Sequence, residues 1–452
     1  MSDEGSFAAR VLHALLREDY AGLRRFIDGQ ALVLPERHIA LVKADGPGFM
    51  SEWVVDARQG LRLDDLFGMV RGVSDPRDDV EAFERECREA WETVRLHEAS
   101  QTDVLGRLAR VPEQSRLGPG TFYESLAAYT DHPVHPMGRC RVGLDAEELR
   151  RYAPEFAPSF RMRWARVASD CVTRHGVLPD WWPGEGLFPV HPLTASHLEG
   201  AELLPEPCVD VAPTLSMRTV AVDGATHLKV PLPTSTLGLR NKRTIVPRTL
   251  PDGALAERLL RHVLEEQPEL PVLLADEQTY GHADSPWLAY LVRRYPPETA
   301  RAHIVPVAAL LAPFPGGGCV AEQWDVPSLF GSYLDALLAW NVVLFRRGIA
   351  LEAHQQNVSL VLDDSGHGPC PSPRLLIKDY DGTLFLGENS FAFAEGTFVD
   401  PRMVTQDPEA LARVFTTITL HLCAAAPAFG LAERGLLPLR TGLAMIRDRL
   451  DA

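Results

Sequence analysis

The 452-residue chain lacks the short motifs that identify several large enzyme classes. It has no G-x-x-x-x-G-K-(S/T) phosphate loop, no G-x-G-x-x-G opening a helix and no G-x-S-x-G nucleophile elbow. Gly316-Gly317-Gly318 has no lysine after it, so we interpret this stretch as a linker. The sequence therefore argues against a P-loop nucleotide hydrolase, a Rossmann-type dehydrogenase and an α/β-hydrolase.

Paired cysteines and membrane-length apolar runs are also missing. The seven cysteines are scattered with no C-x-x-C pair, which argues against a disulfide framework or a zinc knuckle and fits a reducing cytoplasm. The first five residues are acidic and polar, so no signal peptide is expected. The most apolar stretch, residues 328–345, is interrupted by Asp335 and Asn341 and predicts a buried helix. We expect a cytoplasmic protein.

Positive charge is in short supply. Lysine and arginine number 45 against 61 acidic residues, giving a formal net charge of −16 and a pI near 5.4. Such a chain repels nucleic acid and anionic lipid, so neither is an expected partner. An anionic substrate would need a local group of cations.

The length and the apolar spacing predict a protein of several domains, because 452 residues exceed one hydrophobic core. Helices are predicted over 7–27, 80–108, 328–345, 407–424 and 430–450, and strands over 31–34, 39–42, 53–55, 349–351, 358–362 and 375–377. Asp145, three residues before Glu148, predicts a capping box at a helix start. Residues 210–247 alternate apolar runs with Thr, Ser and Pro and predict an antiparallel sheet.

A group of cations is present between Thr214 and Arg248. Asp223 is the single acid in this stretch, and the cations are Arg218, Lys229, Arg240, Lys242, Arg243 and Arg248. Short hydroxyl side chains accompany them, among them Ser216 and Thr219. Cations and hydroxyls together suit phosphate and carboxylate oxygens, although a solvated strand face is the alternative.

A doubled His-Pro motif lies upstream, with His132 and His135 followed by Arg139 and Arg141. Two histidines three residues apart suit a zinc ion, but no third ligand follows closely and the arginines would repel a cation. Anion binding is the better interpretation. His191, also between prolines in Pro-Val-His-Pro, is either a second anion ligand or a core histidine.

The third polar cluster is Glu352-Ala-His354-Gln-Gln356-Asn357 between two predicted strands, followed after a third strand by Lys378-Asp379. Carboxylate and amide oxygens are ligands that Mg²⁺ prefers. Kinases place an acid five residues before an Asn and then a metal-binding Asp, and Glu352 stands five residues before Asn357. The cluster predicts a nucleotide and Mg²⁺ site.

In this order the clusters resemble the aerobactin-synthetase-like (IucA/IucC) family of NRPS-independent siderophore (NIS) synthetases. The similar stretches are His132 to Gly143, Pro189 to Pro192, Pro213 to Thr219, His227 to Leu232, Glu352 to Asn357, and Lys378-Asp379. The resemblance implies an α+β multidomain fold with a cupped-hand architecture and antiparallel sheets in fingers and palm. The expected parts are a helical thumb over 1–165, fingers over 166–315 and a palm over 316–452. Members are often dimers, so a homodimer is expected.

The resemblance also implies the chemistry. ATP and Mg²⁺ would activate one carboxylate of citrate or a related polycarboxylic acid as an acyl-adenylate, which an amine, hydroxylamine or alcohol then captures. Residues expected around ATP are Ser216, Arg218, Thr219, Lys229, His354, Gln356, Asn357 and Asp379. The metal is expected at Glu352, Asn357 and Asp379, and the acid at His132, His135, Arg139, Arg141 and His191. Expected catalytic residues are His354, Arg218, Lys229 and one finger arginine, either Arg240 or Arg243.

Two other classes compete with this interpretation. A kinase-like small-molecule phosphotransferase would also use Glu352, Asn357 and Asp379, but its glycine-rich loop and lysine are not found in the N-terminal part. A non-enzymatic protein that binds citrate or a ferric chelate would use the same cations and would have no need of the acidic cluster. Release of pyrophosphate rather than ADP separates the first rival from adenylation.

Overall fold

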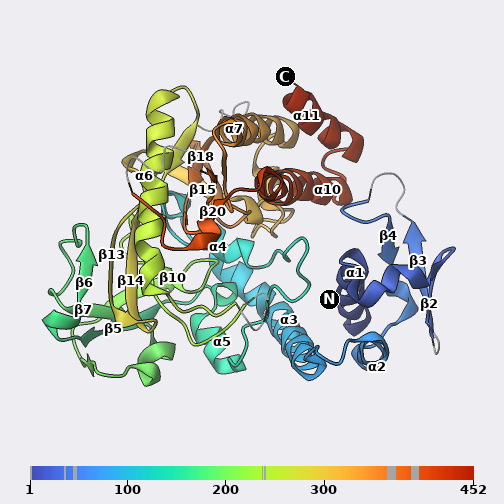
Figure 1. The fold of residues 1–452 in the computed structure, drawn as a ribbon, viewed down its shortest axis with the longest axis horizontal. Coiled ribbons are helices and arrows are strands. Elements are labelled where there is room, and N and C mark those ends of the chain that lie inside the picture. Colours follow the sequence, from blue (N-terminus) through green and yellow to red (C-terminus); the bar gives the residue numbers. More distant parts are fainter. Residues whose placement is uncertain are drawn as a thin grey trace. The chain divides into compact units, whose positions relative to one another are not determined.

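The computed structural model describes residues 3–34, 37–43, 48–236, 238, 241–363, 373–387 and 396–451 (Figure 1). Its contacts divide the chain into two compact units. Unit 1 comprises Met1–Asp103, Asp131–Leu149 and Thr234–Lys242, and unit 2 comprises Val104–Thr130, Arg150–Pro233 and Arg243–Ala452. Each unit is described by itself. The division into thumb, fingers and palm at residues 165 and 315 stays a prediction.

Unit 1 combines helices with a four-stranded antiparallel sheet. Its main elements are α1 (Glu4–Arg17), β1 (Ile27–Asp28), β2 (Ala31–Leu34), β3 (Arg37–Lys43), β4 (Trp53–Val55), α2 (Leu63–Val73) and α3 (Val80–Leu108). The side chain of Asp3 caps α1, and the apolar face of this helix packs into the core with β2 and α2. The predicted strands are confirmed. The predicted capping box is confirmed too, since Glu148 N–H donates to Asp145 at 2.9 Å and Asp145 N–H to Glu148 at 3.1 Å.

Unit 2 contains a nine-stranded antiparallel sheet in the order β6-β13-β14-β11-β10-β9-β5-β7, with β8 paired to β5. The strands are β5 (Phe160–Arg166), β6 (Thr173–His175), β7 (Leu187–Val190), β8 (Glu202–Leu203), β9 (Val209–Pro213), β10 (Thr219–Ala221), β11 (Thr226–Lys229), β13 (Asp276–Ser285) and β14 (Leu288–Arg294). Helix α6 (Leu250–Glu266) packs against β13 (Figure 1). The antiparallel sheet predicted over 210–247 is confirmed as far as Lys229, and residues 234–242 belong to unit 1.

A second sheet in unit 2 has the order β12-β18-β17-β15. Its strands are β12 (Val272–Leu274), β15 (Ala302–Pro306), β17 (Val358–Asp363) and β18 (Arg374–Ile377), and the β12–β18 pair is parallel while the others are antiparallel. A small sheet joins β16 (Ile349–Ala350), β19 (Leu384–Leu386) and β20 (Val404–Thr405). The predicted α+β class with antiparallel sheets is confirmed.

Helix α7 (Val326–Arg346) is the central helix of the largest hydrophobic core. Asp325 caps its start, and after its end Gly348 adopts a φ of +75°, the left-handed conformation in which helices commonly terminate at glycine. Among the described residues, α7 and residues 408–433 are long and apolar enough to cross a membrane by composition alone. Since 61% of the apolar window of α7 is buried inside the protein, a core helix accounts for it.

The C-terminal helices differ from the prediction. They are α9 (Pro408–Val414), a π-helical segment η13 (Phe415–Ala425), α10 (Ala426–Glu433) and α11 (Leu439–Asp451). The prediction of one helix over 430–450 is wrong, because Gly435 adopts a φ of +70° and Pro438 cannot continue the preceding helix.

Candidate functional site

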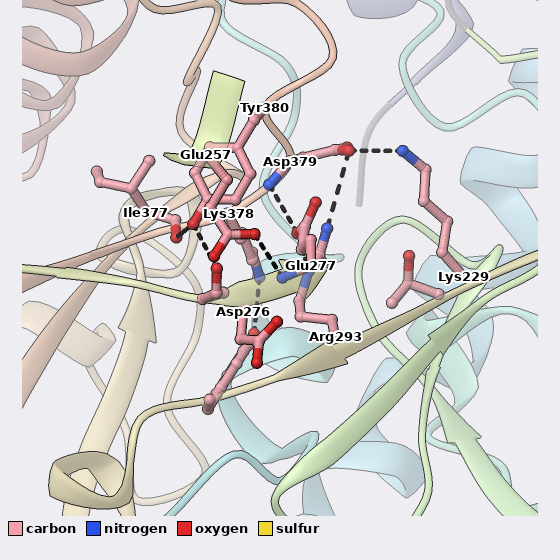
Figure 2. Close-up of polar contacts among 12 residues, drawn as sticks. Lys229, Glu257, Asp276, Glu277, Arg293, Ile377, Lys378, Asp379 and Tyr380 are labelled. Atoms are coloured by element: carbon pink, nitrogen blue, oxygen red, sulfur yellow. Dashed lines mark hydrogen bonds and ion pairs between the residues drawn. The ribbon is translucent and has the colours of Figure 1, made fainter. Parts of the chain in front are cut away.

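The candidate site in unit 2 is built around Asp379, which follows strand β18. Lys229 at the end of β11 places its Nζ 2.5 Å from Asp379 Oδ1 (Figure 2). The same Nζ lies 3.2 Å from Asp381 Oδ2. The Lys229 side chain is 5% exposed, so water screens the Lys229–Asp379 ion pair weakly. Two residues 150 positions apart, both predicted to line the ATP site, are therefore in direct contact.

Strands β13 and β14 supply a second ion pair beside the first. Arg293 Nε lies 2.5 Å from Glu277 Oε1, and Arg293 Nη2 lies 3.8 Å from Asp379 Oδ1 (Figure 2). The backbone N–H of Asp379 donates to the same Glu277 oxygen at 3.0 Å. Asp379 adopts a φ of +69°, the left-handed region that non-glycine residues seldom occupy. Glu277 thus contacts both the backbone of Asp379 and its cationic neighbour.

Charge is distributed so that the aspartate stays ionised. Burial opposes ionisation of Asp379, but Lys229 and Arg293 hold its pKa well below its usual range. Burial raises the pKa of Glu277 in spite of Arg293. The two carboxylates hold the pKa of Arg293 above its ordinary value although burial opposes this. The cluster therefore presents cations fixed beside a permanently charged carboxylate.

Lys229, Glu277 and Asp379 line a cavity of about 130 Å³, with Arg293 beside them through its contacts to both carboxylates. Its lining includes Arg218, Lys229, Thr244, Ile245, Val246, Thr249, Leu250, Gly253, Glu277, Leu291, Asp379, Asp381 and Arg402. A cavity for a whole drug-sized ligand measures roughly 300–1,000 Å³, so this one suits a phosphate-sized group. Cations and carboxylates form one part of its wall and aliphatic side chains another.

A tight turn aims Arg218 at this cavity. The Ser216 hydroxyl accepts the N–H of Thr219 at 3.0 Å, and Met217 adopts a φ of +62°. Arg218 N–H donates to Ser216 O at 2.8 Å, and Arg218 Nη1 donates to Thr244 O at 3.0 Å. Ser216 and Thr219 therefore shape the turn, and Arg218 carries the charge into the cavity lining.

The segment from Glu352 to Asn357 runs between β16 and β17, next to Asp379. Lys378 N–H donates to Asn357 O at 3.1 Å, and Asn357 N–H donates to His354 O at 2.8 Å. Burial lowers the pKa of His354, and Arg243 and Lys378 lower it further against the opposing charge of Asp379. Its surroundings therefore favour the neutral form of the His354 imidazole.

Three carboxylates gather at this end of the site. The Glu352 residue is partly exposed, yet burial of its carboxyl group raises its pKa. The neighbouring carboxylates of Asp381 and Asp379 raise that pKa further. A Cβ at Gly382 would lie 2.2 Å from Glu352 Oε2, so only glycine allows this close approach. Within the described ranges, no three His, Cys, Asp or Glu side chains are arranged to hold a metal by themselves. Mg²⁺ usually takes one or two carboxylates together with substrate phosphates and water, which this repelling group of acids suits.

Both the sequence and the fold of this chain are similar to those of known proteins. The model of the IucA / IucC family matches residues 120–181 and 182–312, and one described as ferric iron reductase FhuF-like transporter matches residues 328–452. The chain is 24% identical over 328 residues to staphyloferrin A synthase of Staphylococcus aureus (strain NCTC 8325 / PS 47), which is 61% of this chain and 55% of that protein. Staphyloferrin B synthase of the same organism is 25% identical over 360 residues, which is 64% of this chain and 59% of that protein.

The chain thus spans somewhat more than half the length of these curated relatives. The solved structure of ATP-bound aerobactin synthetase IucA from a hypervirulent pathotype of Klebsiella pneumoniae has the same fold, with a TM-score of 0.72 over 98% of this chain and 91% of that chain at 17% identity. Residues 120–312 of the chain belong to the IucA / IucC family. The resemblance seen in the sequence motifs is confirmed.

Several residues predicted for the IucA / IucC site lie elsewhere or outside the described chain. His132, His135, Arg139 and Arg141 belong to unit 1. There His132 Nδ1 accepts the N–H of His135 at 3.0 Å, Arg139 pairs with Asp131 at 2.7 Å, and Arg141 donates to Gly138 O at 3.0 Å. Their predicted role in carboxylate binding stays a prediction.

The two finger arginines and His191 have different outcomes. Arg240 lies outside the described residues, whereas Arg243 is close enough to His354 to influence its pKa. His191 is fully buried between Tyr152 and Phe160, with ring centroids at 5.1 and 4.9 Å. It is not among the lining residues of the described cavity, and its predicted role in carboxylate binding stays a prediction.

Sequence reasoning missed Glu277 and Arg293, which complete the cluster, and Glu124, which binds Lys378. Glu124 on α4 (Phe122–Ala127) accepts from Lys378 Nζ at 2.6 Å, and both side chains are buried. A signal existed for the first two, since Glu277 and Arg293 each lie at the end of an apolar strand sequence, where a charge needs a partner. The sequence spacing of Glu277 and Arg293 gave no indication that the two form an ion pair.

Proposed function

We propose that this IucA / IucC family member is an ATP-dependent synthetase that adenylates a carboxylate of a citrate-like acid and joins it to an amine, hydroxylamine or alcohol. The observation that carries the proposal is the set of cations at a phosphate-sized cavity. Lys229, Arg293 and Arg218 all lie at or beside the carboxylate of Asp379. Fixed cations favour the approach of two anions, because no solvent must reorganise as charge develops.

The proposed reaction has two steps. In the first, a carboxylate oxygen attacks the α-phosphorus of ATP, an O–P bond forms, and the bond to pyrophosphate breaks. In the second, the nucleophile attacks the acyl carbon, AMP leaves with the electron pair of the acyl C–O bond, and the nucleophile loses a proton. Arg218 and Lys229 neutralise the approaching anions, and the neutral His354 accepts that proton.

Mg²⁺ would be held by Glu352, Asn357 and Asp379, the ligands expected from the sequence, with Asp381 nearby. When bound, it neutralises phosphate charge and orients the leaving pyrophosphate. We further propose that acid recognition involves His132, His135, Arg139 and Arg141.

The test is release of pyrophosphate and of ADP from ATP with citrate, 2-oxoglutarate, succinate and malonate, each with hydroxylamine as the trapping nucleophile. We expect pyrophosphate and a hydroxamate with at least one acid, and a loss of roughly a hundredfold in Lys229→Met, since one fixed donor commonly contributes that much. Arg166→Met, an exposed strand cation paired with Glu202 at the surface, is the matched control. ADP as the product would favour the phosphotransferase, and no response to any acid would refute the substrate class.

A further inference from the structure

The C-terminal helices contain an unusual break in their hydrogen bonding. In the π-helical segment η13 (Phe415–Ala425), the N–H of Ala426 donates to His421 O, five residues earlier. The next residue is Pro427, which has no N–H. An N–H at residue 427 would bond to Leu422 O in π-helical spacing or to Cys423 O in α-helical spacing. Because Pro427 has none, neither carbonyl receives a hydrogen bond from residue 427. A buried carbonyl without a donor is costly, so another group has to supply one.

Two side chains from other parts of unit 2 supply those bonds. Gln355 Nε2 donates to Leu422 O at 2.6 Å, and the buried hydroxyl of Tyr333 on α7 donates to Cys423 O at 2.8 Å. The thiol of Cys423 in turn donates to Ala353 O at 3.4 Å. The break at Pro427 is therefore bonded to the segment that carries the predicted nucleotide residues.

Gln355 is held at its backbone as well. Its carbonyl accepts the N–H of Ala308, in the short helix η9 (Val307–Ala309), at 3.1 Å. Its sequence neighbours are His354 and Gln356, both expected at ATP, while Gln355 itself turns to the C-terminal helices. Fixing Gln355 between two elements limits how far the residues on either side of it can shift.

We propose that Gln355 is a positioning residue and that Pro427 supplies its acceptor by leaving Leu422 O without a helical partner. An ordinary helix would use this carbonyl internally and release the segment. The role in catalysis rests on the proposed adenylation, whereas the anchoring itself does not. The π-helical segment η13 is thus bonded to the nucleotide segment by two side-chain hydrogen bonds, Gln355 Nε2 to Leu422 O and Cys423 Sγ to Ala353 O.

The test compares Gln355→Leu, Pro427→Ala and the double variant by steady-state pyrophosphate release and thermal melting. Gln355→Leu should lose roughly ten- to a hundredfold in kcat/KM, mainly through KM for ATP, as expected for a shift of about 1 Å in positioning groups. Pro427→Ala supplies a helical N–H that competes with Gln355. It should therefore lower kcat/KM in the same way while leaving Tm equal to or above that of the wild type. The double variant should be no worse than Gln355→Leu.

The divergence of activity from stability in Pro427→Ala is the readout that a merely structural role would not produce. Gln323→Leu, an exposed glutamine in unit 2, is the control and should match the wild type. Wild-type kinetics in Pro427→Ala, or a loss in Gln355→Leu that only follows its Tm, would overturn the proposal. If the wild type releases no pyrophosphate, the proposed function fails, but the anchoring by Gln355 can still be tested by hydrogen exchange of the backbone amides of residues 352–357. Faster exchange in both single variants supports the anchoring, and unchanged exchange refutes it.

Discussion

Glu277 Oε1 accepts the backbone N–H of Asp379 at 3.0 Å, and the same oxygen lies 2.5 Å from Arg293 Nε. The first contact holds a residue with a φ of +69°, a conformation that costs about 1–3 kcal/mol and persists only when its surroundings enforce it. The second fixes a cation beside the Asp379 carboxylate. One buried carboxylate therefore organises both the backbone and the charge of the candidate site.

Replacing Glu277 should damage stability and activity by separable amounts. Glu277→Ala leaves the buried Arg293 without its closest partner and with Asp379 at 3.8 Å, and breaking a buried ion pair typically costs about 3–5 kcal/mol of unfolding free energy. Glu277→Gln keeps an oxygen for the Asp379 N–H but loses the charge, so we expect an intermediate stability and a loss of at least tenfold in kcat/KM. Urea unfolding and pyrophosphate release measure the two effects. Glu202→Gln, an exposed acid of the same sheet, is the control. Wild-type stability in Glu277→Ala would contradict the role given to this residue.

Removal of a predicted metal ligand should raise the Mg²⁺ requirement. Glu352, Asp379 and Asp381 repel one another, and a divalent cation would relieve this repulsion. Glu352→Gln should increase the Mg²⁺ concentration for half-maximal pyrophosphate release by about tenfold or more, the lower range for losing a metal-site partner. Glu409→Gln, a surface acid, should leave it unchanged. An unchanged Mg²⁺ dependence in Glu352→Gln would exclude this carboxylate as a ligand.

Local patterns predicted most of the elements that carry the site. The three strands predicted around Glu352 and Asp379 correspond to β16, β17 and β18. These patterns are local because a helix or strand buries one face at a fixed period. The cation Lys229 and the acid Asp379 were also predicted at one site, and the structure brings them into contact.

Long-range pairing could not be predicted in the same way. Glu277 meets Arg293 only because β13 and β14 are neighbours with a register shift after Asp276, and Glu124 meets Lys378 across 254 residues. The π-helical segment was read as an ordinary helix, since its apolar residues do not reveal a change from four- to five-residue spacing. The sequence left His191 as either an anion ligand or a core histidine, and it is the aromatic rings of Tyr152 and Phe160 beside it that favour the core.

The buried Lys378–Glu124 pair should be structural. Burial opposes both charges, but each partner shifts the pKa of the other so that both stay ionised. Lys378→Met alone should destabilise the protein by about 3–5 kcal/mol, because it leaves Glu124 charged and buried. Adding Glu124→Gln should recover much of that loss and keep the bond from Leu215 N–H, which now reaches Glu124 at 2.9 Å. Urea unfolding of both variants measures this, and a double variant no more stable than Lys378→Met would contradict it.

Two buried histidines should make the protein acid-sensitive well above the range where carboxylates titrate. Burial lowers the pKa of His191 to about 3, and burial together with Lys378 and Arg293 lowers that of His227 to about 4. In the unfolded chain both titrate near a pKa of about 6.5, so between these values the unfolded state binds more protons. The stabilising contribution of the neutral imidazoles is therefore complete above about pH 6.5 and is lost as the pH falls toward 4, by up to about 1.4 kcal/mol per pH unit for each histidine.

His191→Phe tests this dependence, because the ring keeps its aromatic contacts with Tyr152 and Phe160 but cannot take a proton. It should cost about 1 kcal/mol at pH 8, where the bond from Leu193 N–H to His191 Nδ1 is lost, and should lose less stability than the wild type between pH 7 and 5. Urea unfolding at several pH values measures both slopes, with the exposed His38→Gln as control. Equal slopes in the wild type and His191→Phe would show that His191 titrates alike in both states and is accessible, as an acid-binding histidine would be.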